Sequence, residues 1–482
     1  MSLTKKVLFN TSVQFVGKIV NTLIGLASVA IITRYLGVAG YGDYTTAFAY
    51  IMFFSVISDF GFFWIIVRKI AAGEDIKKVI QASQALRLLF STGIFLVSLL
   101  LVLFLPYSAT LKIALIMVAV SIFWMSQNSV YLALFQAKMR MDWPVIAETI
   151  GRVLGLGLML VAIYLGLDFL WIVAAGLSAS LFNFIFNLFF GWRYTSFGFY
   201  FHKPLMRTIL FESAPVGLIT ILGLIYFRID TVLLSLFKGS IDVGIYGTAY
   251  KILEILMALP GMFVASVFPA ISAAHTQNDN QRVKTLIQKS FDALSIGAFA
   301  VMALFFSLAT PTINLVAGKE FLITSTTSIF GVVFASDKVL QILIIAVGLS
   351  FWTNLFSNAL ISIKKQGSLI RPYIFATAVN VVLNLILIPK FSYVAAALVT
   401  IITQLILLVY CLVLVRRSTE LKVTLSVFIK SFIAGLIIVV VGLLIKNWNF
   451  FISLPILLVS YILILLAIKA FFVATIKKII KA

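Results

Sequence analysis

Charged residues and cysteine are both scarce in this chain of 482 residues. Only 11% of the residues are charged, and the single cysteine, Cys411, cannot form a disulfide within one chain. His202 and His275 are the only histidines, and neither lies in a cysteine or carboxylate arrangement typical of a metal site. The sequence lacks a Walker A motif, and Gly155-x-Gly157 has neither the following glycines nor the preceding strand of a dinucleotide fingerprint. We therefore expect no metal, no bound cofactor, no catalytic residues and no direct use of ATP.

Apolar residues are abundant instead. They make up 62% of the chain, with a mean hydropathy of +1.15, which excludes a soluble domain of this length. About fourteen apolar runs reach the roughly 20 residues that a spanning helix needs, and the connections between them leave no room for a soluble catalytic domain. The sequence predicts an all-α integral membrane protein with spans at 8–35, 43–67, 80–105, 111–137, 144–165, 168–192, 209–237, 243–270, 285–310, 338–363, 369–389, 393–415, 424–445 and 449–475. The apolar part of 311–337 is too short for a span, so we expect an interfacial or re-entrant segment outside the membrane.

Basic residues outnumber acidic ones, 37 to 16, and most of them fall on one side of the predicted membrane. Because loops rich in Lys and Arg stay in the cytoplasm, this distribution places both termini there. The basic surface then faces anionic lipid headgroups, and no nucleic-acid partner is expected. The basic residues on this side include Arg68, Lys69, Lys77, Lys78, Lys364, Lys365, Arg416, Arg417, Lys477 and Lys478.

An internal repeat divides the chain into two halves. Gly42-Asp43-Tyr44-Thr45-Thr46-Ala47 returns 202 residues later as Gly244-Ile245-Tyr246-Gly247-Thr248-Ala249, and Gly37 matches Gly239 at the same offset. Six spans separate the copies, so both halves enter the membrane in the same orientation, as in many secondary transporters. We predict a first lobe at 1–195, a cytoplasmic basic linker at 196–208 and a second lobe at 209–417. The remaining residues, 418–482, carry two spans that have no counterpart in the repeat.

Several motifs resemble a known transporter group. Leu36-Gly37-x-x-Gly40-Tyr41-Gly42-x-Tyr44, Ser58-Asp59-Phe60-Gly61 and Phe268-Pro269-Ala270-Ile271-Ser272 resemble the multidrug/oligosaccharidyl-lipid/polysaccharide exporter superfamily. The run from Asn380 to Pro389, followed by Ala395-Ala396-Ala397, is similar to the branch of O-antigen and capsule polysaccharide flippases. One departure is Phe391-Ser392 and Val394, where that branch usually carries glycines around a turn.

The resemblance implies a fold and an activity. The fold has two six-helix lobes related by a pseudo-two-fold axis, two extra C-terminal helices, and helices 1, 2, 7 and 8 facing a central cavity. The activity is alternating-access flipping of a polyprenyl-pyrophosphate-linked oligosaccharide repeat unit from the cytoplasmic to the outer leaflet of the bacterial cytoplasmic membrane. Expected partners are the lipid-linked oligosaccharide, membrane lipids and other polysaccharide-assembly proteins. By analogy with lipid II flippases, the two extra helices are a candidate groove for the lipid tail.

Ionisable side chains inside spans mark the candidate site. Each costs roughly 2.5–3.5 kcal/mol on insertion scales and usually faces a cavity or a partner. Three cations, Lys18, Arg228 and Lys251, lie on helices that the resemblance places around the cavity. Arg can bind phosphate oxygens in a bidentate manner and Lys supplies a point charge, so these residues suit a pyrophosphate. The sequence predicts a cationic substrate cavity.

The other polar and charged candidates each allow a structural as well as a functional interpretation. Asp59, Asp230 and Glu254 are coupling-ion candidates or charge partners: Asp59 for Arg68 or another basic group, Asp230 for Arg228 or Lys18, and Glu254 for Lys251. Asn10, Gln14 and Asn21 on helix 1 suit sugar hydroxyls or interhelical hydrogen bonds equally well. Glu148 and Arg152, four residues apart, are expected to form a structural pair.

Two energy sources are available for transport without ATP. The membrane potential favours outward movement of an anionic headgroup by roughly 2.3 kcal/mol per charge per 100 mV, and a proton or sodium gradient is a second source of energy.

A drug or organic-cation antiporter of the same superfamily is the first alternative function, although three basic groups would repel cations. A membrane-embedded polysaccharide polymerase or ligase is the second. Such an enzyme would need a larger outer loop than 311–337, whose only charged residues are Lys319, Glu320 and Asp337.

Overall fold

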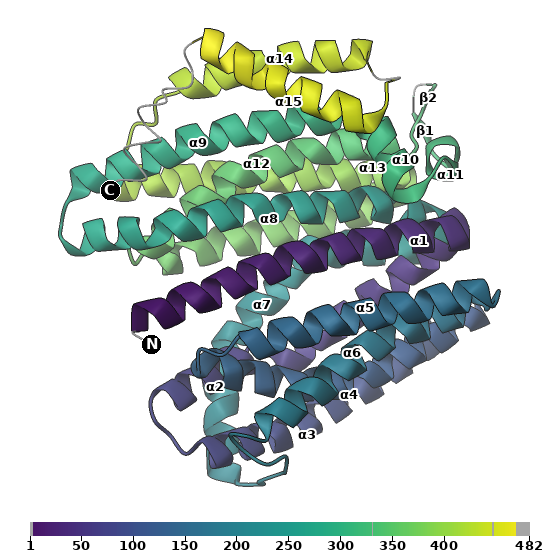
Figure 1. Cartoon of the computed structure of the whole chain (residues 1–482), viewed down its shortest axis with the longest axis vertical. Coiled ribbons are helices and arrows are strands. Elements are labelled where there is room, and N and C mark those ends of the chain that lie inside the picture. Colours follow the sequence, from purple (N-terminus) through teal and green to yellow (C-terminus); the bar gives the residue numbers. More distant parts are fainter. Residues whose placement is uncertain (1–2, 330, 446–447, 469–482) are drawn as a thin grey trace. The chain divides into compact units, whose positions relative to one another are not determined.

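The computed structural model describes residues 3–329, 331–445 and 448–468, and the side chains from residue 9 onward. The chain forms two compact units, Met1–Gly244 and Ile245–Ala482 (Figure 1).

Long helices build the first unit. Helices α5 and α6 pack along one another, and α4 packs against α6 and α3. Helix α8 begins in this unit and continues into the second. The helices are α1 (Leu3–Asp59), α2 (Phe62–Ala71), α3 (Ile76–Phe104), α4 (Ala109–Ala137), α5 (Asp142–Tyr164), α6 (Phe169–Gly191), α7 (Lys203–Phe237) and α8 (Ser240–Thr276).

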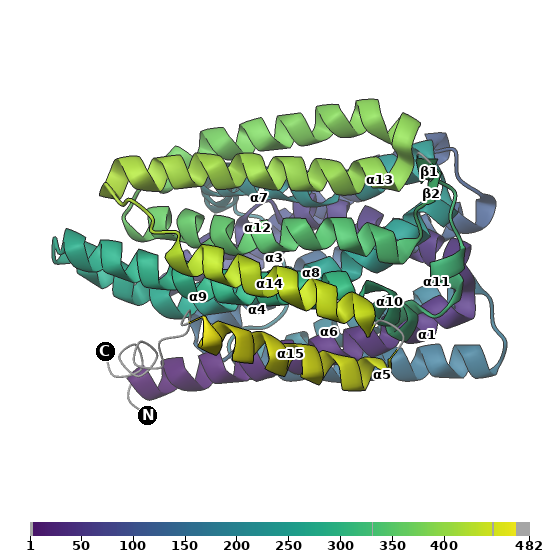
Figure 2. The same cartoon turned by 90° about the horizontal axis from the view of Figure 1, so that it is seen from above.

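The second unit combines long helices with one small hairpin. Helix α14 packs against α9 and α15, and the two views of the chain show these helices side by side (Figures 1 and 2). Its elements after α8 are α9 (Asn280–Ser307), α10 (Ala309–Ala317), α11 (Glu320–Ile323), β1 (Ser328–Ile329), β2 (Val332–Val333), α12 (Ser336–Ser362), the 3₁₀ helix η1 (Gln366–Leu369), α13 (Ile370–Thr419), α14 (Ser426–Leu444) and α15 (Phe450–Ala467).

The structure confirms an all-α, multi-pass membrane protein. Among the described residues, twelve helices are long and apolar enough to cross a membrane. Two of them contain one non-helical residue each, Gly37 (φ 66°) in α1 and Ser392 (φ 50°) in α13. Each of these two helices covers two of the predicted spans, which accounts for the difference between twelve and fourteen. Residues 469–475 of the last predicted span lie outside the described residues.

The second predicted span, 43–67, is interrupted. Helix α1 ends at Asp59, Phe60 (φ 42°) and Gly61 (φ 76°) form a turn, and α2 begins at Phe62. A Cβ atom on Gly61 would lie 2.8 Å from the backbone nitrogen of Gly217 in α7, so only glycine fits this contact. The flanking residues are apolar on both sides of the turn, and hydropathy alone therefore extends the span beyond Asp59.

The segment 311–337 forms short elements that precede α12 and includes the first two residues of that helix. Helices α10 and α11 lead into an antiparallel hairpin in which Ser328 pairs with Val333 and Ile329 with Val332. Tyr393, next to the turn in α13, donates a hydrogen bond of 2.6 Å to the Phe334 carbonyl. The hairpin is thereby tied to the turn at Ser392.

The repeat is visible in the backbone. Gly37 and its counterpart Gly239 both adopt positive φ, 66° and 98°, at the turn that follows the first span of each half. Glycine is required at both places because side chains strain this conformation.

Candidate functional site

Helix α1 presents the first candidate cation. Its N-terminal part packs on α5 through Gly17, where an added Cβ would overlap the side chain of Val145. Lys18 follows directly and is exposed. Among the described residues, no Asp or Glu lies within 4 Å of its ammonium group. An unpaired cation therefore protrudes from an apolar span.

The three polar residues proposed for sugar contacts differ in their surroundings. Asn10 is buried, donates to the Met139 carbonyl and accepts from the backbone nitrogen of Met141 at 2.9 Å. Gln14 is exposed. Asn21 is 5% exposed, and its Oδ1 has no hydrogen-bond donor among the described residues. Asn10 joins helix α1 to the loop before α5, whereas the side chain of Gln14 is accessible.

Helix α7 carries Arg228 and Asp230 in the first unit. Arg228 is half-buried and Asp230 is only 3% exposed. The Oδ1 atom of Asp230 accepts from the backbone nitrogen of Thr231 at 2.6 Å and from its hydroxyl at 3.3 Å. Asp230 therefore accepts two hydrogen bonds from the next residue of its own helix.

Lys251 belongs to the second unit, whereas Lys18 and Arg228 belong to the first. The ammonium nitrogen of Lys251 is 3.2 Å from Glu254 Oε2, one turn further along α8. Both side chains are partly exposed. The pair has no net charge, so Lys251 adds less positive potential than Lys18 does.

Asp59 has a partner that the sequence interpretation did not name. Arg87 of α3 is fully buried, and its Nη2 lies 2.6 Å from Asp59 Oδ1. Arg87 also donates to the Ser126 carbonyl at 3.0 Å and to Ser129 Oγ at 3.2 Å, and its guanidinium carbon lies 5.3 Å from the centre of the Phe62 ring. This buried centre joins the C-terminal end of α1 to α3 and α4.

Of the two options that the sequence left open for Asp59, Arg68 or another basic group, the structure shows the second, because Asp59 pairs with Arg87. Arg68 Nη2 lies 2.7 Å from Glu212 Oε2 on α7, and Lys69 lies 3.1 Å from Glu74. The turn at Phe60 and Gly61 directs α2 toward α7 and leaves Asp59 facing α3. The sequence signals that Arg87 needs a partner, because it is a charged residue within the predicted span 80–105, but it does not identify that partner as Asp59.

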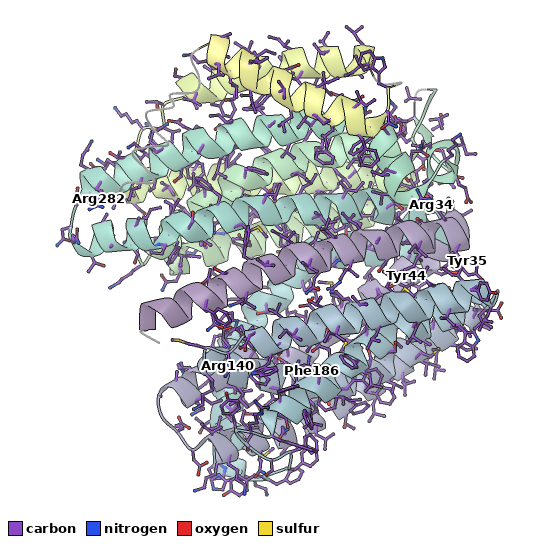
Figure 3. All side chains as sticks on the ribbon, viewed as in Figure 1. Arg34, Tyr35, Tyr44, Arg140, Phe186 and Arg282 are labelled. Atoms are coloured by element: carbon purple, nitrogen blue, oxygen red, sulfur yellow. The ribbon has the colours of Figure 1, made fainter. Side chains whose placement is uncertain are left out.

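The remaining predicted pair is present. Glu148 Oε1 accepts from Arg152 at 2.8 and 3.0 Å along one face of α5. Arg140 and Tyr35 mark the two ends of α5 in Figure 3: Arg140 lies in the loop before it, and the Tyr35 hydroxyl donates to the Leu167 carbonyl after it at 2.8 Å.

Comparison with known proteins gives one family match and two partial relatives. The model of a family described as "Polysaccharide biosynthesis protein" matches residues 7–275. "Probable low-salt glycan biosynthesis flippase Agl15" and "Probable flippase AglR", both from Haloferax volcanii, are 27% and 23% identical over 181 residues. These alignments cover 37% of this chain and 35% and 36% of the relatives, so the chain matches about a third of their length.

Solved structures share the fold over most of the chain. "Lipid II flippase MurJ, inward closed conformation" superposes with a TM-score of 0.75 at 16% identity, covering 95% of this chain and 98% of the other. A multidrug resistance MATE family transporter gives 0.64 at 16% identity, with 83% and 95% covered. A transporter of the same superfamily from Pyrococcus furiosus gives 0.59 at 18% identity, with 87% and 97% covered. The predicted superfamily fold is confirmed.

Proposed function

This chain belongs to the polysaccharide biosynthesis protein family, and on that basis we propose that it is a flippase for lipid-linked glycan precursors. The substrate is a polyprenyl-pyrophosphate-linked oligosaccharide repeat unit, which moves from the cytoplasmic to the outer leaflet of the bacterial cytoplasmic membrane by alternating access. Both termini face the cytoplasm in this proposal. The names of the two partial relatives support flipping, and the fold is compatible with it.

Lys18 is the observation that carries the proposal. It lies ten residues after the start of the predicted span 8–35, which is about 15 Å along the helix axis. An ammonium group at that depth is costly unless it faces water or an anion. Its exposure and the lack of an acidic partner within 4 Å among the described residues fit a water-filled path that receives a phosphate. Arg228, half-buried on α7, provides a second cation that is able to bind phosphate oxygens in a bidentate manner.

The charge of the substrate supplies the driving force in this proposal. A membrane potential that is negative inside favours outward transfer of a pyrophosphate by roughly 2.3 kcal/mol per charge per 100 mV. Asp59, Asp230 and Glu254 remain candidates for coupling to protons or sodium. Their contacts with Arg87, Thr231 and Lys251 give each a structural function as well.

Gene deletion in the native host tests the proposal without the problem of glycan selectivity. We expect the deletion strain to lose surface glycan and to accumulate the lipid-linked repeat unit on the cytoplasmic side. The wild-type gene and a Lys77→Ala control should restore export, since Lys77 is an exposed lysine that precedes the predicted span 80–105. Lys18→Ala and Arg228→Ala should restore little, and Lys251→Ala should have an intermediate effect.

The same strains distinguish the alternative functions. Unchanged surface glycan together with increased drug sensitivity would support an antiporter and contradict the proposal. Accumulation of unpolymerised repeat units on the outer leaflet would support a polymerase. Full rescue by all three alanine variants would remove the cationic path but leave the flippase assignment in place.

A further inference from the structure

The segment that connects α6 to α7 exposes an unusual concentration of aromatic rings. No Asp or Glu occurs from residue 169 to residue 211. The same stretch contains Arg193, His202, Lys203 and Arg207, all exposed. Six aromatic side chains between residues 189 and 201 are 38% to 60% exposed: Phe189, Trp192, Phe197, Phe199, Tyr200 and Phe201. We call this set of basic and aromatic residues the linker surface.

Hydrogen bonds to α3 hold the linker surface in place. The backbone nitrogen of Tyr200 donates to the Gln81 carbonyl at 3.1 Å, and Gln81 Nε2 donates to the Ser196 carbonyl at 3.3 Å. Gln84 Oε1 accepts from the backbone nitrogen of Gly198 at 3.4 Å. The rings are therefore presented by a loop with defined contacts to the first unit.

Arg193 is oriented by aromatic contacts and not by an acidic residue. Its guanidinium carbon lies 5.4 Å from the centre of the Trp143 ring and 5.2 Å from that of Phe190, and these rings stack at 3.9 Å. Arg140 lies over Trp143 as well but is paired with Asp142 at 2.9 Å. Among the described residues, no carboxylate lies within 4 Å of Arg193. Figure 3 labels Arg140 and Phe186 at this end of α5 and α6.

We propose that the linker surface binds the headgroups of acidic phospholipids in the cytoplasmic leaflet. The segment follows the end of one spanning helix and precedes the start of the next, so it lies at the level of the headgroups. Aromatic side chains are favourable at that level, and each basic residue near an anionic surface adds about fivefold to binding. Ile185 and Leu181 lie one and two turns before Phe189 in α6. Both are exposed and apolar, so they extend the linker surface toward the acyl chains.

The charge pattern favours lipid over other anionic partners. A protein or nucleic-acid site would carry its rings and cations away from the membrane, whereas here they continue directly from the exposed apolar face of α6. The proposal depends on the placement of the chain in a membrane and on cytoplasmic loops, and not on flipping. A lipid bound here would contact the segment of chain that connects the two repeats in sequence.

Lipid nanodiscs provide the test. We would compare the full chain in phosphatidylcholine and in mixtures with phosphatidylglycerol, and measure the lipids retained by native mass spectrometry and the thermal unfolding midpoint. The linker variant combines Arg193→Gln, Lys203→Gln and Arg207→Gln. The matched control combines Arg282→Gln, Lys365→Gln and Arg416→Gln, which removes the same charge from exposed residues of the second unit. A second variant, Phe199→Ser with Phe201→Ser, keeps the charge and removes two rings.

Wild type and control should retain phosphatidylglycerol in preference to phosphatidylcholine and should unfold at a higher temperature when it is present. The linker variant should retain at least about fivefold less phosphatidylglycerol than wild type while unfolding at the wild-type temperature in phosphatidylcholine. The amount retained by the ring variant should lie between those of wild type and the linker variant. Equal retention by wild type and linker variant would overturn the proposal, as would an equal loss in the control. Displacement of the lipid by millimolar inorganic phosphate would assign the surface to free phosphate and also overturn it.

Discussion

Arg87 and Asp59 form a charged pair at the junction of α1, α3 and α4, with Nη2 of Arg87 2.6 Å from Oδ1 of Asp59. The Arg87 side chain is 1% exposed and the Asp59 side chain is 28% exposed, so the guanidinium is buried while the carboxylate is partly accessible. Ser129 also donates to the same carboxylate oxygen at 2.8 Å. The turn that follows Asp59 packs against Gly217 of α7, and the position of Asp59 therefore sets the position of that turn.

Removing one partner of this pair should be costly. Asp59→Asn leaves the buried guanidinium of Arg87 without a counter-charge, and a loss of about 3–5 kcal/mol is expected. Arg87→Met with Asp59→Asn removes both charges and should cost clearly less than the sum of the single changes. Thermal unfolding of the purified single and double variants in one detergent measures this. Additive losses would contradict a direct pair, and Glu148→Gln, which breaks a half-exposed pair on α5, serves as a mild control.

Gly42 and Gly244 occupy equivalent positions of the repeat and make reciprocal contacts. A Cβ atom on Gly42 would overlap the Ser240 carbonyl, and one on Gly244 would overlap the Val38 carbonyl. We expect Gly42→Ala and Gly244→Ala each to lower the unfolding midpoint markedly, because the added methyl group would force the two contacting backbone segments apart. Gly223→Ala, in α7 with no atom within 4 Å of the added group, should be neutral or slightly stabilising. Equal midpoints for Gly42→Ala and Gly223→Ala would show that the contact is not made.

Ser392 adopts φ 50° and ψ −138°, a conformation that favours glycine. It stands where the resembling branch usually has glycine around this turn. We predict that Ser392→Gly stabilises the chain by about 1 kcal/mol through relief of backbone strain. Ser426→Gly, at the start of α14 with an exposed side chain, should be neutral or destabilising. A lower midpoint for Ser392→Gly than for wild type would contradict the argument.

Gly151 and Gly155 bring α5 and α6 together. Cβ atoms on them would lie 2.7 Å from the Ala179 carbonyl oxygen and 2.9 Å from Ala179 Cβ, respectively. This small-residue motif therefore serves packing within the chain. Gly155→Val should cost about 1–3 kcal/mol by overpacking. Gly157→Val on the same helix meets no atom within 4 Å at Cβ and is the matched control. Equal unfolding midpoints for Gly155→Val, Gly157→Val and wild type would contradict this prediction.

Local patterns predicted much of the fold and some of the pairs. Hydropathy placed the spans, and the repeat identified Gly37 and Gly239 as equivalent positions. The pairs Lys251–Glu254 and Glu148–Arg152 followed from the helical spacing of three and four residues. These features depend only on residues close in sequence.

Features that depend on which helix faces meet were not predictable from one sequence. The partner of Asp59 lies on a different helix, and Arg68, nearer in sequence, turns instead to Glu212. The break at Phe60 and Gly61 follows from a close approach to Gly217, which leaves no trace in hydropathy. The hairpin at 328–333 was likewise seen only as an apolar segment too short for a span.

The central claim is that Lys18 receives the pyrophosphate of a lipid-linked glycan during flipping. Purified protein in liposomes that contain a polyprenyl-pyrophosphate-linked oligosaccharide allows a direct test, in which a membrane-impermeant glycosidase reports how fast the sugar changes leaflet. We predict that wild type accelerates the exchange, that Lys18→Arg retains most of the rate, and that Lys18→Ala reduces it at least about tenfold, with Lys77→Ala unchanged. Equal rates for Lys18→Ala and wild type would contradict the account of the site. A wild-type rate no faster than that of protein-free liposomes would contradict the flippase itself.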